Sequence, residues 1–199
     1  MALLERSGLV SSRFCAVHLT HPLEGDVDRV VDSDGSICVC PSTELDLGDG
    51  FLPLDARLRA RLCLGSDSHA RIDLLHETAT LEMHGRALAG RRNVLTPEGE
   101  KHGLAERLLT AATLSGSRSL GRPDVGIAAG MPADLVSLDL RRPAAWGVPP
   151  LEAAALVASA AWVDEVWVAG RKVVSGGVHP LRERVLAAAR PVIASALAR

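Results

Sequence analysis

Three short apolar runs, each ending in polar residues, most strongly constrain how this chain can fold. The runs are RFCAVHL (13–19), SICVCP (36–41) and RLCLGS (61–66). Between the first two, EGDVDRVVDSDG places its valines on one face of a helix, and IDLLHETATLEMHGRALAG after the third predicts a long amphipathic helix. Strands that alternate with helices at this spacing predict βαβ units and a parallel sheet, and so an α/β fold.

The other segments predict a more varied set of elements. The glycine-rich stretch STELDLGDG is expected to be a polar loop after the second strand. We expect Pro191 to kink or break the last helix. The remaining predicted elements are a short helix over 54–60, a helix over 98–121, a strand over 133–140 and a hairpin within 163–180.

Charge and composition exclude several classes of function. The 199 residues carry a formal net charge of −2, which gives no sign of a nucleic-acid partner. No stretch approaches the roughly 20 uninterrupted apolar residues that span a membrane. The first residues, MALLERSGLV, lack the basic start and the longer apolar core of a secretory signal. We therefore expect a cytoplasmic protein with no membrane and no nucleic-acid partner.

The four cysteines all lie inside apolar runs. They are Cys15, Cys38, Cys40 and Cys63. The C-x-C pair formed by Cys38 and Cys40 could indicate a metal site, but no second pair at zinc-site spacing follows it. We predict buried, reduced thiols that act as small apolar side chains.

Each of the three predicted strands is followed by side chains that can do chemistry. In chain order they are His18 and His21, then Ser42, Thr43 and Glu44, then Asp67 and His69. Because active-site groups of parallel α/β sheets lie where strands end, a carboxylate and an imidazole from different strands can converge on a metal-activated water. Simpler interpretations stay open, since His18 could be a core histidine and Asp67 could cap the next helix.

The order and spacing of these motifs resemble a known family. AVHLTH, CPSTELDLGDG, LCLGSDSHARIDLLHE and GRRNVL are similar to the C-terminal part of the amidohydrolase superfamily, and most of all to formimidoylglutamate deiminases. The later stretches GIAAGMPADLVSLDL and DEVWVAGRKVVSGGVHPLRERV resemble the superfamily's link to its small β-domain and its closing hairpin and helix. The resemblance extends from about residue 3 to the C-terminus.

This resemblance implies a particular fold. Family members have a (β/α)₈ barrel, a TIM barrel, with a small β-sandwich domain. Residues 1–121 would form the C-terminal part of the barrel, with about strands six to eight. Residues 122–180 would form part of the β-sandwich, including an inserted helix, and residues 181–199 would form a C-terminal helix.

The resemblance also implies a chemistry. Asp67 would be a ligand of one divalent metal, usually zinc, and would take a proton from the attacking water. His18 would act with Asp67 in proton transfer. The small-molecule substrate would be N-formimino-L-glutamate, hydrolysed to N-formyl-L-glutamate and ammonia in histidine degradation. The alternatives are a deaminase of a nucleobase or another cyclic amidine, and a non-catalytic remnant or docking subunit.

The match is incomplete in one important respect. Family members take further metal ligands from an H-x-H motif on the first barrel strand and a histidine on the fifth, and neither has a counterpart here. A catalytic zinc has three protein ligands, of which only Asp67 matches. A complete barrel also needs about 250 residues. We therefore expect a fragment that is inactive alone, binds no stoichiometric zinc, and associates with itself or with a complementary N-terminal half.

Overall fold

The computed structural model describes residues 1–54, 62–68, 70–96, 103–122 and 125–198. Two compact units make up the chain. The first comprises Met1–Gly126 with Leu140–Ala160, and the second comprises Ile127–Asp139 with Ala161–Arg199. Each unit contains one three-stranded sheet. The domain boundaries predicted at residues 121 and 180 stay predictions.

The sheet of the first unit is parallel, as the alternating pattern predicts. Its strands are β1 (Cys15–Val17), β2 (Ser36–Val39) and β3 (Leu62–Leu64), in the order β1-β2-β3. Cys38 of β2 lies in register with Val17 on one side and with Cys63 on the other. The carboxyl ends of all three strands therefore meet at one edge of the sheet.

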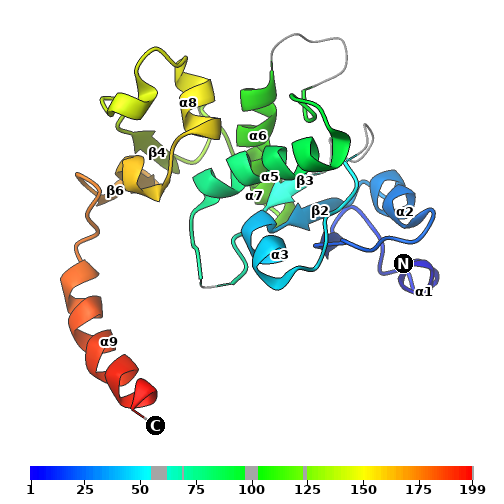
Figure 1. Cartoon of the computed structure of the whole chain (residues 1–199), viewed down its shortest axis with the longest axis horizontal. Coiled ribbons are helices and arrows are strands. Elements are labelled where there is room, and N and C mark those ends of the chain that lie inside the picture. The colour runs from blue at the N-terminus through cyan, green and yellow to red at the C-terminus, as the bar shows by residue number, and fades with distance from the viewer. Residues whose placement is uncertain (55–61, 69, 97–102, 123–124, 199) are drawn as a thin grey trace. The chain divides into compact units, whose positions relative to one another are not determined.

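Helices connect and cover these strands (Figure 1). In the first unit they are α1 (Ala2–Arg6), α2 (Asp26–Asp32), α3 (Pro41–Leu47), α5 (Leu74–Ala89), α6 (Leu104–Ala112), α7 (Leu114–Ser119) and α8 (Pro150–Leu156), with the 3₁₀ turn η1 (Pro143–Ala145). The long helix expected near 72–90 is confirmed as α5. All but the first residue of the helix predicted over 54–60, and the first part of the one predicted over 98–121, lie outside the described residues. The rest of the latter divides at Thr113 into α6 and α7.

The stretch that follows β2 is a helix, α3, so the prediction of a loop there was wrong. Pro41 occupies its first turn, where the missing N–H costs nothing. The carboxylate of Glu44 accepts the backbone N–H of Cys40 at 2.9 Å, which satisfies a donor that the helix itself leaves unpaired. Gly48 ends the helix in a left-handed conformation. The polar residues thus lie in the first turn of a helix rather than in an irregular loop.

The core of the first unit lies between the sheet and its helices. Ile37 and Val39 of β2 are almost fully buried, whereas Cys38 between them is half-buried, because successive strand residues face opposite sides. α5 and α6 both pack against β3 and against α8. The buried apolar cluster consists of Ala16, Val30, Ile37, Val39, Leu52, Leu62, Leu64, Leu81, Leu95, Ala105, Leu108, Ala111 and Ala155.

The second unit contains an antiparallel sheet. Its strands are β4 (Leu135–Leu138), β5 (Val163–Val168) and β6 (Arg171–Val174), in the order β4-β5-β6, with the 3₁₀ turn η2 (Ala160–Trp162) before β5. The predicted hairpin is confirmed: Ala169 and Gly170 connect β5 to β6 with φ of 48° and 75°, as a tight hairpin turn requires.

The last helix, α9 (Arg182–Leu197), belongs to this unit and continues through Pro191. The expected break there was therefore wrong. A proline removes one backbone hydrogen bond of a helix, and sixteen residues offer enough others to continue past it. No helix among the described residues has the length and hydropathy needed to span a membrane.

A buried histidine of the first unit has a ring nitrogen that is unpaired within the described part of the chain. His84 of α5 is 6% exposed, and its ring lies 4.0 Å from that of Phe51, centroid to centroid. Its Nε2 has no hydrogen-bond partner among the described residues. Burial lowers the pKa of His84 from 6.5 to about 4, because the charged imidazolium would lose its hydration.

We predict that His84 makes the fold sensitive to acid. Between pH 6.5 and 4 the unfolded chain takes up a proton at His84 that the folded chain does not, so the free energy of unfolding falls as the pH falls. At pH 4.5 this loss is roughly 2–3 kcal/mol. Urea unfolding at pH 7 and 4.5 measures it. His84→Leu should remove this component, while the control His21→Leu, at an exposed position, should keep it. Equal pH dependence in wild type and His84→Leu would contradict the prediction.

Candidate active site

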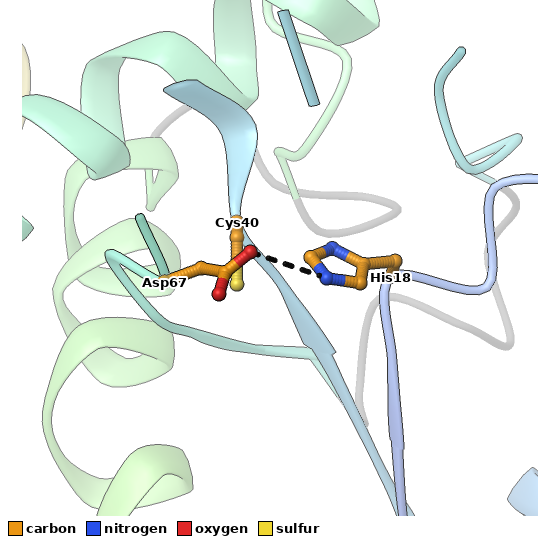
Figure 2. Close-up of side chains that lie close together, drawn as sticks. All are labelled: His18, Cys40 and Asp67. Atoms are coloured by element: carbon orange, nitrogen blue, oxygen red, sulfur yellow. Dashed lines mark ion pairs between the residues drawn. The ribbon is translucent and has the colours of Figure 1, made fainter. Parts of the chain in front are cut away.

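Three strand ends of the first unit bring together an imidazole, a thiol and a carboxylate. His18 follows β1, Cys40 follows β2, and Asp67 lies just after β3. One ligand atom of each lies within 4.8 Å of the others. Figure 2 shows the Asp67 carboxylate and the His18 ring facing each other, with the Cys40 thiol beside the carboxylate. His18 Nε2 and Asp67 Oδ2 are 3.4 Å apart.

Two of these residues have an unusual backbone conformation. His18 and Asp67 have φ of 65° and 47°, in the left-handed region that non-glycine residues rarely adopt. Each such conformation raises the free energy of the folded state by on the order of 1 kcal/mol, and it persists only when surrounding contacts hold it in place. These conformations occur directly after β1 and just after β3, at the same edge of the sheet, where the His18 and Asp67 side chains lie close to each other.

Glu44, in the first turn of α3, holds two members of the group. Its Oε1 lies 3.2 Å from Nδ1 of His18 and accepts the backbone N–H of Cys40 at 2.9 Å. The side chain is 2% exposed. Burial raises the pKa of the Glu44 carboxyl, while the hydrogen bonds from Cys40 and His18 act in the opposite direction. Glu44 thereby fixes the orientation of the imidazole and the position of the residue that carries the thiol.

Thr43 holds the third member. Its Oγ1 donates to the carbonyl of Ser66 at 3.2 Å and accepts the N–H of Ser68 at 3.1 Å. These two backbone groups flank Asp67 on either side. A single buried hydroxyl therefore clamps the turn that presents the Asp67 carboxylate.

The same turn of α3 is attached to α5. The N–H of Ser42 donates to Oε2 of Glu77 at 2.8 Å, and the Ser42 hydroxyl donates to Oε1 of the same carboxylate. Glu77 is fully buried, so these bonds replace the water that its carboxylate would otherwise require. The carboxylate thus anchors the helix that holds the three strand ends.

The structure brings together the two site residues predicted from the sequence, His18 and Asp67. Asp67 does not cap the following helix, because Asp73 does so by accepting the N–H of His76 at 3.1 Å. The His18 side chain is 32% exposed, which excludes a simple core histidine. His21 is exposed and lies outside the group, and His69 lies outside the described residues.

The thiols differ partly from the prediction. All four cysteines are free, and Cys40 and Cys63 are buried as expected, but Cys15 and Cys38 are half-buried. The neighbouring Cys40 and Cys63 thiols raise the pKa of the Cys38 thiol. Sequence reasoning treated Cys40 only as a small apolar residue and missed its place beside His18 and Asp67. Cys40 lies at the end of the second strand, two residues before the polar run that begins at Ser42, and this position could have indicated a role in the site.

The group suits a divalent metal chemically. Imidazole nitrogen, thiolate sulfur and carboxylate oxygen are the donors that zinc takes in proteins. The three donors come from separate strand ends, and two of them are partly open to solvent, which leaves room for a further ligand. The residues present therefore fit a zinc ion in type and mutual distance.

Comparison with known proteins establishes the family. Residues 2–173 match the amidohydrolase family. The chain belongs to the amidohydrolase family. It is 34% identical over 180 residues to a formimidoylglutamate deiminase of Pseudomonas aeruginosa, an alignment that covers 88% of this chain and 40% of that protein.

Solved structures of other amidohydrolases share the fold. An amidohydrolase from Brucella melitensis matches with a TM-score of 0.85 and 30% identity over 98% of this chain and 44% of its own. An adenosine deaminase from Xanthomonas campestris with bound zinc matches with a TM-score of 0.84 and 30% identity over 96% and 44%. This amidohydrolase thus has the TIM-barrel type of fold of its family, with mixed α and β content, and spans about two fifths of the length of these relatives.

We predict that Glu77 is essential to the stability of the first unit. Glu77→Ala leaves the buried N–H and hydroxyl of Ser42 without a partner, and should lower the free energy of unfolding by about 2–4 kcal/mol. The same substitution at the exposed Glu106 of α6 is the control and should change it by less than about 0.5 kcal/mol. Chemical denaturation measures both variants. Similar losses from the two substitutions would contradict an anchoring role for Glu77.

Proposed function

We propose that this chain is the C-terminal part of a metal-dependent deiminase that hydrolyses N-formimino-L-glutamate to N-formyl-L-glutamate and ammonia. The observation that carries the proposal is the 34% identity to a formimidoylglutamate deiminase over 88% of this chain. The juxtaposition of His18 and Asp67 supports it, because both lie at strand ends, where the family resemblance assigns their roles. Such a reaction would belong to histidine degradation.

In this proposal the strands β1, β2 and β3 correspond to about the sixth, seventh and eighth strands of the barrel, within residues 1–121. The sheet formed by β4, β5 and β6 corresponds to part of the small β-sandwich domain, within residues 122–180, and α9 to the C-terminal helix of residues 181–199. Both outer strands of the parallel sheet then need neighbours to close a barrel. Val17 on β1 is 55% exposed, which supports association with a second copy or with an N-terminal half.

The proposed reaction divides between two side chains. The carboxylate of Asp67 accepts a proton from the water that attacks the formimino carbon. The imidazole of His18, held at Nδ1 by Glu44, polarises the substrate C–N centre and delivers a proton to the departing nitrogen, which leaves as ammonia. One water is consumed, and the C–N double bond of the formimino group becomes the C–O double bond of the formyl group.

The metal of such a site would be zinc or another divalent ion. Asp67 would hold it together with histidines from polypeptide outside these 199 residues, as the family resemblance implies. The ion would supply Lewis-acid activation of the water and of the substrate. The bound zinc in the Xanthomonas campestris adenosine deaminase supports this assignment.

A second candidate is a deaminase that acts on a purine nucleoside. The 30% identity to the Xanthomonas campestris adenosine deaminase favours it, and Asp67 and His18 could perform the same water attack on a ring amidine. Substrate choice depends on loops from the rest of the barrel, so activity on the two substrates discriminates between the candidates.

We predict that ammonia release needs a complementary half. The full chain alone should release no ammonia from N-formimino-L-glutamate, because most metal donors of the family site are absent from it. Co-expression with the N-terminal part of the Pseudomonas aeruginosa deiminase, followed by purification of the complex, should restore release from this substrate and not from adenosine. Release is measured in an enzyme-coupled ammonia assay.

The matched controls are two aspartate variants of this chain in the same complex. Asp67→Asn should abolish release, while Asp46→Asn, at an exposed position of α3, should leave it unchanged. Release from adenosine alone would favour the second candidate. A stable complex that releases ammonia from neither substrate would point instead to a non-catalytic docking protein.

A further inference from the structure

A third donor beside Asp67 and His18 suggests a capacity that the proposed function does not contain. We propose that this chain, without any other polypeptide, binds a thiophilic divalent cation such as Zn²⁺ through the Sγ of Cys40, Nε2 of His18 and the carboxylate of Asp67. This goes beyond the proposed deiminase and does not depend on it. This ligand set also differs from the one that the family resemblance implies, to which this chain would contribute Asp67 alone.

The distance between His18 and Asp67 supports a metal between them. Their nearest atoms are 3.4 Å apart, which is long for a charge-assisted hydrogen bond of about 2.7–2.9 Å. Donors at about 2.1 Å from a tetrahedral zinc lie about 3.4 Å from each other. The two atoms are therefore already spaced as two corners of such a coordination tetrahedron require.

Glu44 supports the same conclusion from the other side of the ring. When Nδ1 of His18 donates to Oε1 of Glu44, Nε2 of the neutral ring presents a lone pair toward the Asp67 carboxylate. Two lone-pair donors that face each other are held together by a proton or by a cation, and a metal ion suits the 3.4 Å distance between them. A carboxylate that fixes the second nitrogen of a ligating histidine is the usual outer partner in zinc sites.

Cys40 is the third donor, and it lies on the buried side of the proposed metal site. The residue is 3% exposed, and the bond from its N–H to Glu44 sets its position. Gly65 leaves room for the sulfur, because a Cβ added there would lie 3.1 Å from Sγ of Cys40. The side chains of His18 and Asp67 are 32% and 43% exposed, so the opposite side stays open to a fourth ligand from solvent.

The proposal reverses the expectation, drawn from the sequence, that the chain alone binds no stoichiometric zinc. That expectation counted only residues at the family's ligand positions, of which Asp67 was the single match. Cys40 is not one of those positions, so it was not counted. With Cys40 and His18 included, the chain offers three protein donors, the number that an open zinc site uses.

The test is a titration of the reduced full chain with Co²⁺, followed by displacement with Zn²⁺. We expect one Co²⁺ per chain, a sulfur-to-cobalt charge-transfer band in the near ultraviolet, and loss of that band when Zn²⁺ is added. Cys40→Ser should remove the band. The control Cys15→Ser, at a half-buried thiol outside the group, should retain it. A band that survives Cys40→Ser, or that disappears with Cys15→Ser, would overturn the proposal.

A second pair of variants avoids the buried thiol, whose replacement could disturb folding. Asp67→Asn should weaken Co²⁺ binding by at least the roughly 10–100-fold that loss of an outer partner causes. Asp46→Asn, an exposed carboxylate of α3, should bind Co²⁺ as the wild type does. Unchanged affinity in Asp67→Asn, or no stoichiometric binding by the wild-type chain, would refute the site.

Discussion

The first turn of α3 is the constraint on which the candidate site depends. Ser42, Thr43 and Glu44 are consecutive, polar and buried, and each forms hydrogen bonds with a different part of the fold. Ser42 bonds to Glu77 of α5, Thr43 to the turn after β3, and Glu44 to His18 after β1. A buried polar group without a partner costs about 1–3 kcal/mol, so these bonds tie three strand ends to one helix.

The same hydrogen bonds explain why strained conformations persist after β1 and β3. His18 and Asp67 both have positive φ, which is unfavourable for residues with a Cβ. Thr43 bonds to the backbone on both sides of Asp67, and Glu44 bonds to the ring of His18. The favourable bonds of α3 offset the unfavourable turns, and the two reactive side chains face each other as a result.

Local pattern was sufficient for the parallel strands and the helix α5. Apolar runs give the strands, and neighbouring parallel strands end at one edge, where their polar residues gather. The choice of His18 and Asp67 among those polar residues came from the family resemblance. The helix α3 and the role of Cys40 could not be predicted in this way. The helix α3 is held by bonds to residues far along the chain, such as the one from Ser42 to Glu77. The role of Cys40 depends on the fold that brings His18 and Asp67 beside it. Cys40 also belongs to an apolar run, so the sequence pattern indicated a buried apolar side chain and not a metal ligand.

His18 cannot serve both proposed sites at once. A ring whose Nδ1 is held by Glu44 has only Nε2 left, and that atom either ligates a metal or exchanges protons with a substrate. In the chain alone, the proposed metal site uses Nε2 of His18 together with Cys40 and Asp67. Under the proposed function, histidines from an N-terminal half would replace Nε2 and Cys40 in a completed barrel and leave Asp67 as the shared ligand. Nε2 would then be released for proton transfer, so joining the halves would itself convert a binding site into a catalytic one.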